Sequence, residues 1–135
     1  MIHPALELQS VIFAHLSVDS NVLEALGSAA IFDDVPDNRK PPYVTFGEAV
    51  HSDWSTGTES GTEHEIRLEA WSDRRGRKQA MNIAQAIVEA TLNLPSALGD
   101  HNLVNLTHES TRITRDIEQE LFRAEVNLRA VTEPS

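Results

Sequence analysis

Apolar residues recur at helical spacing in two regions of the chain. Positions three or four apart predict a helix over residues 5–16, with Pro4 suited to its first turn. A polar interruption follows, and then a second, short helix that ends just before Gly27. Another apolar stripe at the same spacing predicts a third helix over about residues 74–93, after the start signal Ser72-Asp73.

Alternating apolar and polar residues predict the strands. In the middle of the chain, Ile66, Leu68 and Ala70 face one way while the charged residues between them face the other. The segments 52–62 and 112–120 are polar and are expected to be connections between strands. The expected strands cover residues 29–32, 43–50, 63–71, 102–111 and 121–132.

The order of these elements predicts an α+β fold. We expect a mostly antiparallel sheet of four to five strands, with two to three helices packed on one face. The 135 residues suit one hydrophobic core, so we expect a single domain over residues 1–135. Charged residues of the strands 63–71 and 121–132 lie on the other face of the sheet, which must meet water or a water-filled channel.

Charge and composition limit the possible functions. The chain has 11 Lys plus Arg against 21 Asp plus Glu, a net charge of −10, so tight binding of free nucleic acid is not expected. Cysteine is absent, which excludes disulfides, thiolate metal sites and cysteine nucleophiles. No apolar run approaches the roughly 20 residues that span a bilayer, so we expect no membrane partner.

Histidines are the main candidates for acid–base or metal chemistry. They are His3, His15, His51, His64, His101 and His108. None of them forms an HExxH zinc motif, and His64 must point to the opposite face from the adjacent Glu63 and Glu65. We interpret the histidines as scattered surface or edge residues. We therefore expect no catalytic site, metal or cofactor.

One basic cluster stands out in this acidic chain: Arg74, Arg75, Arg77 and Lys78. It falls in the first turns of the third predicted helix, where positive charge opposes the helix dipole. These side chains are therefore either a solvated helix start or a contact for an acidic patch on a neighbouring copy or partner. A local contact with DNA is a further alternative, which the net charge of −10 disfavours. Trp54 and Trp71 are expected in a loop or off the core face, either as contact residues or at the edge of the core.

Seven segments carry a further signal through their order and spacing. They are residues 31–36, 42–47, 53–56 and 63–72, the Arg-rich start of the third helix, and residues 101–106 and 122–132. Together they resemble the small tail-completion proteins, or tail terminators, of long, flexible-tailed bacteriophages and of phage-like gene transfer agents, formerly a domain of unknown function. The resemblance spans nearly the whole chain.

This resemblance implies a structural protein of the virion or gene transfer agent particle, assembled in the bacterial cytoplasm. It implies a ring of about six copies at the head–tail interface. The ring sits on the major tail-tube protein, stops polymerisation of the tube and meets the head-side stopper or connector protein. DNA passes through without specific binding, which suits a ring with a net charge of about −60. The family offers no catalytic or cofactor residues to transfer to this chain.

A ring closes when one patch of each copy binds a different patch of the next copy. The candidate pair is the basic cluster and the acidic stretch from Glu59 to Glu65. The full set of candidate interface residues is Asp53, Trp54, Glu59, Glu63, Glu65, Trp71, Arg74, Arg75, Arg77 and Lys78. Two other interpretations stay open: an α+β module that binds a ligand or peptide and is unrelated to virions, and a small hydrolase that uses His with Asp or Glu.

Overall fold

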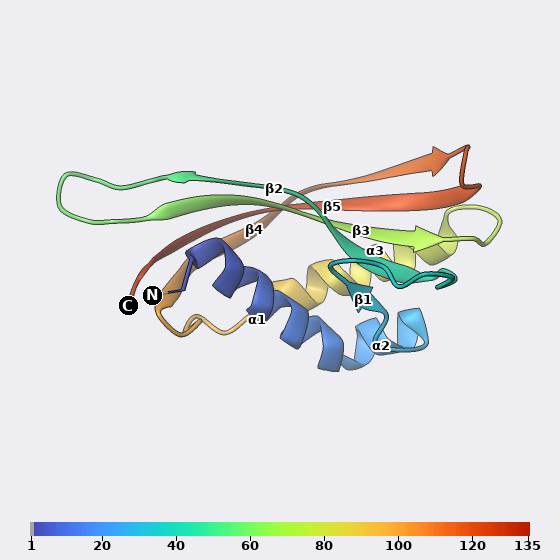
Figure 1. Cartoon of the computed structure of the whole chain (residues 1–135), viewed down its shortest axis with the longest axis horizontal. Coiled ribbons are helices and arrows are strands. Elements are labelled where there is room, and N and C mark those ends of the chain that lie inside the picture. The colour runs from blue at the N-terminus through green and yellow to red at the C-terminus, as the bar shows by residue number, and fades with distance from the viewer. Residues whose placement is uncertain (1) are drawn as a thin grey trace.

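The computed structural model describes residues 2–135. The elements are α1 (Pro4–Val18), α2 (Ser20–Leu26), β1 (Ile31–Phe32), β2 (Tyr43–Asp53), β3 (Thr62–Ser72), α3 (Lys78–Thr91), β4 (His101–Asp116) and β5 (Leu121–Pro134). The strands form one sheet in the order β1-β2-β3-β5-β4, in which only β1 pairs in parallel. Figure 1 shows the three helices on one side of this sheet, so the predicted α+β fold is confirmed.

Local sequence sets the bounds of the first two helices. The ring of His3 accepts a hydrogen bond from the backbone N–H of Ala5 at 3.0 Å, which caps α1. The carboxylate of Asp19 does the same for α2, and Gly27 then ends this helix in the left-handed conformation, with φ of 79°. Residues between these caps follow the predicted apolar spacing.

The core lies between the helices and the covered face of the sheet. Ile12 of α1 and Ile83 and Ile87 of α3 are fully buried, as is Leu68 of β3 in the centre of the sheet. The predicted alternation in β3 and β5 is confirmed, because Leu68 and Ala70 of β3 and Val126 of β5 are buried under the helices. None of the helices in this described part of the chain has the length and apolar character to cross a bilayer.

Two hairpins extend further than the sequence predicts. The strand β2 continues to Asp53 and β4 continues to Asp116, so the β4–β5 connection is only residues 117–120. Beyond Val50, the outer part of the β2–β3 hairpin has no apolar face to produce an alternating pattern. In the β4–β5 hairpin, Ile113 and Phe122 still pack against the core. We call residues 50–65, the outer half of the β2–β3 hairpin, the arm; its tip projects past the helices at one end of the molecule (Figure 1).

The strand β4 forms one edge of the sheet along its 16 residues. Near its start it contacts the preceding loop through the bridge between Ala97 and Asn102. Its register against β5 shifts twice, between Leu103 and Asn105 and between His108 and Ser110. The edge is therefore long but irregular.

Candidate functional site

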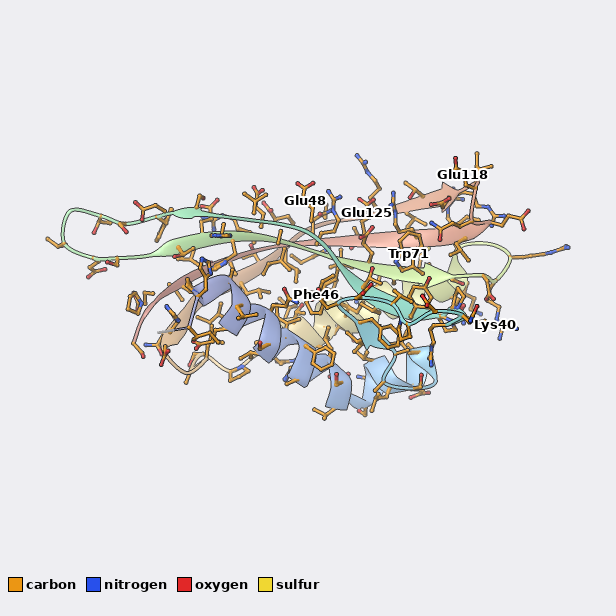
Figure 2. The ribbon with its side chains drawn as sticks, viewed as in Figure 1. Lys40, Phe46, Glu48, Trp71, Glu118 and Glu125 are labelled. Atoms are coloured by element: carbon orange, nitrogen blue, oxygen red, sulfur yellow. The ribbon has the colours of Figure 1, made fainter. Side chains whose placement is uncertain are left out.

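The open face of the sheet carries a network of ion pairs between β3 and β5. Arg123 lies 2.9 Å from Glu125 and 3.4 Å from Glu69, and Arg67 lies 3.8 Å from the other oxygen of Glu125. Arg129 pairs with Glu63 at 2.7 Å. Although it lies on the open face (Figure 2), Glu125 is only 5% exposed, because long charged side chains cover it. Each arginine of these two strands is therefore held by a carboxylate.

Trp71 extends this network toward the end of the sheet. Its indole N–H donates to the Thr45 hydroxyl at 3.0 Å, and the Arg123 guanidinium lies 5.4 Å from its ring centroid. Burial raises the pKa of the neighbouring Glu69 carboxyl above its ordinary value, and the Arg123 charge opposes this rise. The structure thus places Trp71 off the core face, as expected, but half-buried among charged side chains.

The arm is acidic throughout. Its carboxylates belong to Asp53, Glu59, Glu63 and Glu65, and residues 50–65 contain no lysine or arginine. Hydrogen bonds from the hydroxyl and backbone of Ser55 lower the pKa of the Asp53 carboxyl, so this carboxyl stays charged at neutral pH. Trp54 stands beside it and is 50% exposed. The candidate residues of the arm therefore lie together on one projecting element.

The three arginines of the basic cluster lie before α3, not in its first turns as predicted, and Lys78 is the first residue of the helix. The helix begins only at Lys78, because Gly76 has a φ of 80°, which helical backbone does not adopt. Arg74 and Arg75 are exposed in the β3–α3 loop and so do not oppose the dipole of α3 from within its first turns, as the sequence had predicted. Arg77 lies over the Phe122 ring at 5.8 Å.

The arm and the basic cluster lie at opposite ends of the molecule (Figure 1). The strand β3 separates them, since the arm tip precedes Thr62 and the basic loop follows Ser72. An 11-residue strand spans about 33 Å. Within one chain the two predicted interface patches therefore cannot touch.

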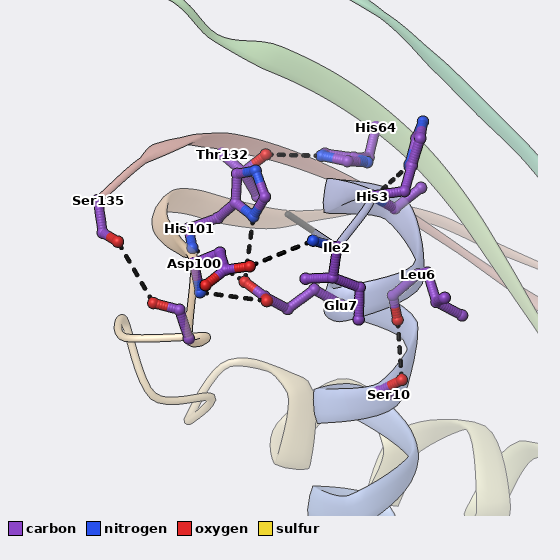
Figure 3. A network of polar contacts seen from close by, with 12 residues as sticks. Ile2, His3, Leu6, Glu7, Ser10, His64, Asp100, His101, Thr132 and Ser135 are labelled. Carbon is purple, nitrogen blue, oxygen red and sulfur yellow. Dashed lines mark hydrogen bonds and ion pairs between the residues drawn. The ribbon is translucent and has the colours of Figure 1, made fainter.

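The sequence suggested that the histidines are scattered surface or edge residues, but two of them are not. His64 and His101 are buried, on the helix-covered side of the sheet and at the start of β4. The Glu7 carboxylate accepts hydrogen bonds from the backbone N–H of His101 at 2.9 Å, its ring Nδ1–H at 3.1 Å, and the backbone N–H of Asp100 at 3.1 Å (Figure 3). Sequence reasoning missed Glu7, because nothing distinguishes it from a solvated glutamate in a helix.

His64 and its neighbours form the other half of this region. The His64 ring lies 2.8 Å from the Thr132 hydroxyl, and in the strand register it stands opposite His51, whose ring contacts His3 at 4.6 Å between centroids. Burial is the main reason that the pKa of His64 falls to about 4, and the nearby histidines add to the effect. Between residues 2 and 135, no group of three His, Asp or Glu is placed to hold a metal ion.

Acid should destabilise the protein through His64. An unfolded histidine has a pKa near 6.5, above the folded value, so between pH 6.5 and 4 the unfolded state binds a proton that the folded state does not. Stability is therefore complete above pH 6.5 and falls below it, by about 2 kcal/mol at pH 4.5. Urea unfolding of the His64→Asn variant at pH 7.5 and 4.5 should show a smaller loss than wild type.

The exposed His108 provides the matched control for this measurement. The His108→Asn variant should keep the acid sensitivity of wild type. Equal acid sensitivity of the His64→Asn variant and wild type would contradict the assignment to His64.

Comparisons with known proteins cover nearly the whole chain. The model of the family described as "Tail completion protein gp17" matches residues 10–133. A chain of the solved structure "Virion of native gene transfer agent (GTA) particle" is 25% identical, with a TM-score of 0.85 over 98% of this chain and 99% of that chain. No curated protein gives a significant match. The similarity therefore concerns the whole fold.

Proposed function

The chain belongs to the tail completion protein gp17 family and is a structural component of a virion or gene transfer agent particle, and on this premise we propose that it forms a closed ring at the head–tail junction. The ring has about six copies. It ends polymerisation of the tail tube, binds the head-side connector protein and leaves a passage for DNA. The family resemblance predicted from the seven sequence segments is confirmed by the match over residues 10–133.

Unlike charges at opposite ends of the molecule carry the ring proposal. The arm has four carboxylates and no lysine or arginine, and the β3–α3 loop has the exposed residues Arg74 and Arg75, with Arg77 and Lys78 beside them. Contacts between the two ends of successive copies join one patch to a different patch. Such head-to-tail contacts produce a ring when the rotation between copies closes. The charges also favour this orientation over contacts between like ends.

The charged sheet face suits the wall of the passage. Its arginines Arg67, Arg123 and Arg129 are held in ion pairs, so they are not free to retain a phosphate backbone. The face also has a depression of about 420 Å³, in whose lining carboxylates outnumber guanidinium groups: Glu48, Glu65, Glu109 and Glu125 against Arg67 and Arg112. A wall of this kind repels DNA weakly and lets it slide.

Charge-reversal variants at the two ends of the molecule test whether the arm and the basic loop pair in the ring. The double variant Arg74→Glu/Arg75→Glu should prevent ring closure, and light scattering and electron microscopy of tails isolated from producing cells should show tubes of uncontrolled length without a terminal ring. Adding Glu59→Arg/Glu65→Arg in the same chain should restore the ring, because the pairs are rebuilt with reversed sign.

The rescue is the control that separates lost pairing from lost folding. If the variant with all four substitutions is folded but still forms no ring, the arm and the basic loop do not pair as proposed. If tails made with the first double variant still end in a ring at normal length, the basic loop has no part in closure.

A further inference from the structure

The helix α1 has apolar residues on its exposed side as well as its buried side. Leu6, Phe13 and Val18 are 54%, 44% and 75% exposed, and Ile2 precedes them. The apolar residues of α3 are, by contrast, gathered mainly on its buried side. A helix that is apolar around its whole circumference is typical of one that is covered on both sides. The outer side of α1 is therefore suited to a protein contact.

A groove runs between the start of α1 and the base of the arm. It has a volume of about 340 Å³ and a mainly apolar lining that includes Leu6, Phe46, Val50 and Ile66. The lining also contains His3, His51 and His64, together with Glu65 and with Arg67, which is already paired with Glu125. The groove thus offers an apolar slot with a polar rim.

A single apolar side chain projects from the opposite end of the molecule. Ile117 is 82% exposed in the turn between β4 and β5, the largest exposure among the big apolar residues of the described chain. Its neighbours in this turn are acidic: Asp116, Glu118 and Glu120. Figure 2 shows this end through the label of Glu118, far from the arm.

We propose that the β4–β5 turn of one copy inserts Ile117 into the α1 groove of the next copy, an inference that rests on the ring proposed above. Ile117 fills the apolar slot, and the carboxylates of its turn stay in water at the polar rim, beside His51. Each copy then donates its turn at one end and offers its groove at the other.

The position of the turn beside the basic loop supports a second copy as the occupant. Arg77 of the loop and Arg115 of β4 both lie over the Phe122 ring, at 5.8 and 4.9 Å, so the two elements form one end of the molecule. The groove likewise adjoins the arm, since Val50 and His51 belong to both. The apolar contact and the charge contact therefore join the same two ends, and one head-to-tail interface contains both.

The absence of cysteine from the sequence allows a direct test by crosslinking. In the double variant Leu6→Cys/Ile117→Cys, mild oxidation of assembled tails should produce a disulfide-linked ladder that reaches the full number of copies in the ring. Each single variant should give at most dimers. The variant Met81→Cys/Ile117→Cys, which moves the first thiol to an equally exposed position on α3, should give no ladder.

A second variant measures the energetic weight of the contact. Ile117→Asp should raise the protein concentration required for ring formation by at least tenfold. Val104→Asp, at a half-exposed position of β4, should leave it unchanged. Because both positions are exposed, neither variant should unfold the chain.

The outcomes separate this inference from the ring itself. A ring seen by microscopy, with no ladder from Leu6→Cys/Ile117→Cys and no effect of Ile117→Asp, overturns the docking of the turn and leaves the ring intact. Tails that end in no ring at all overturn both. A ladder formed equally well from Met81→Cys shows nonspecific collision and also overturns the docking.

Discussion

Replacing Glu7 with alanine is expected to lower the free energy of unfolding by about 3 kcal/mol, a large share of the stability of a domain of this size. The carboxylate is buried and accepts three hydrogen bonds from Asp100 and His101. Alanine would leave these buried donors without a partner. Chemical denaturation with urea at pH 7 measures the loss.

Two further variants sharpen this prediction. Glu7→Gln keeps an acceptor oxygen and should lose less than alanine does. Glu24→Ala removes an exposed carboxylate from α2 and should change the stability by less than about 0.5 kcal/mol. A Glu7→Ala variant as stable as Glu24→Ala would show that the buried bonds contribute little. Because Glu7 and His101 are 94 positions apart in sequence, the expected loss also measures how firmly α1 is held to the start of β4.

The second large effect should appear on the charged sheet face. In the double variant Glu69→Gln/Glu125→Gln, Arg67 and Arg123 lose their charged partners and become available to phosphates. We expect the affinity for duplex DNA at low salt to rise by at least tenfold over wild type, and to fall again as salt is added. Fluorescence anisotropy of a labelled duplex at 50 and 200 mM NaCl tests this.

The matched control keeps the same change in net charge. Glu24→Gln/Glu89→Gln removes two carboxylates from the helical side of the molecule and frees no arginine by breaking an ion pair on the sheet. This variant should bind DNA as weakly as wild type. If both double variants bind equally, net charge alone controls adhesion and the ion pairs do not matter.

The parts of the fold with one buried side could be predicted from the sequence. In β3 the apolar residues Ile66, Leu68 and Ala70 all face the helices, and the alternation shows this directly. The strand residues 51–53 could not be predicted, because they are exposed and no buried side selects a pattern. Residues 112–116 of β4 contain a single hydrophobic residue, Ile113, which is too little to produce an alternating pattern. The start of α3 was misplaced because the sequence pattern did not reveal that Gly76 adopts a positive φ.

The contacts and burial of the charged side chains were harder to predict than the face of the sheet on which they lie. The charged face was expected from the alternating residues of β3 and β5. The burial of Glu125, however, comes from arginine side chains on both strands, and an alternating pattern within one strand does not show contacts with the next. Glu7 and His64 were missed for a related reason. Their environment is made by residues far away in sequence, Asp100 and Thr132.

The irregular edge of β4 has a consequence for the chain before assembly. A long, flat edge strand is a template on which identical strands add to one another, and the end of such growth is aggregation. The register shifts at Leu103/Asn105 and His108/Ser110 interrupt the regular spacing of the backbone N–H and C=O groups. The β4 strand of a second chain therefore cannot pair with this edge along its full length. We therefore expect this irregular edge to keep newly made chains from adding to one another through β4 before they assemble.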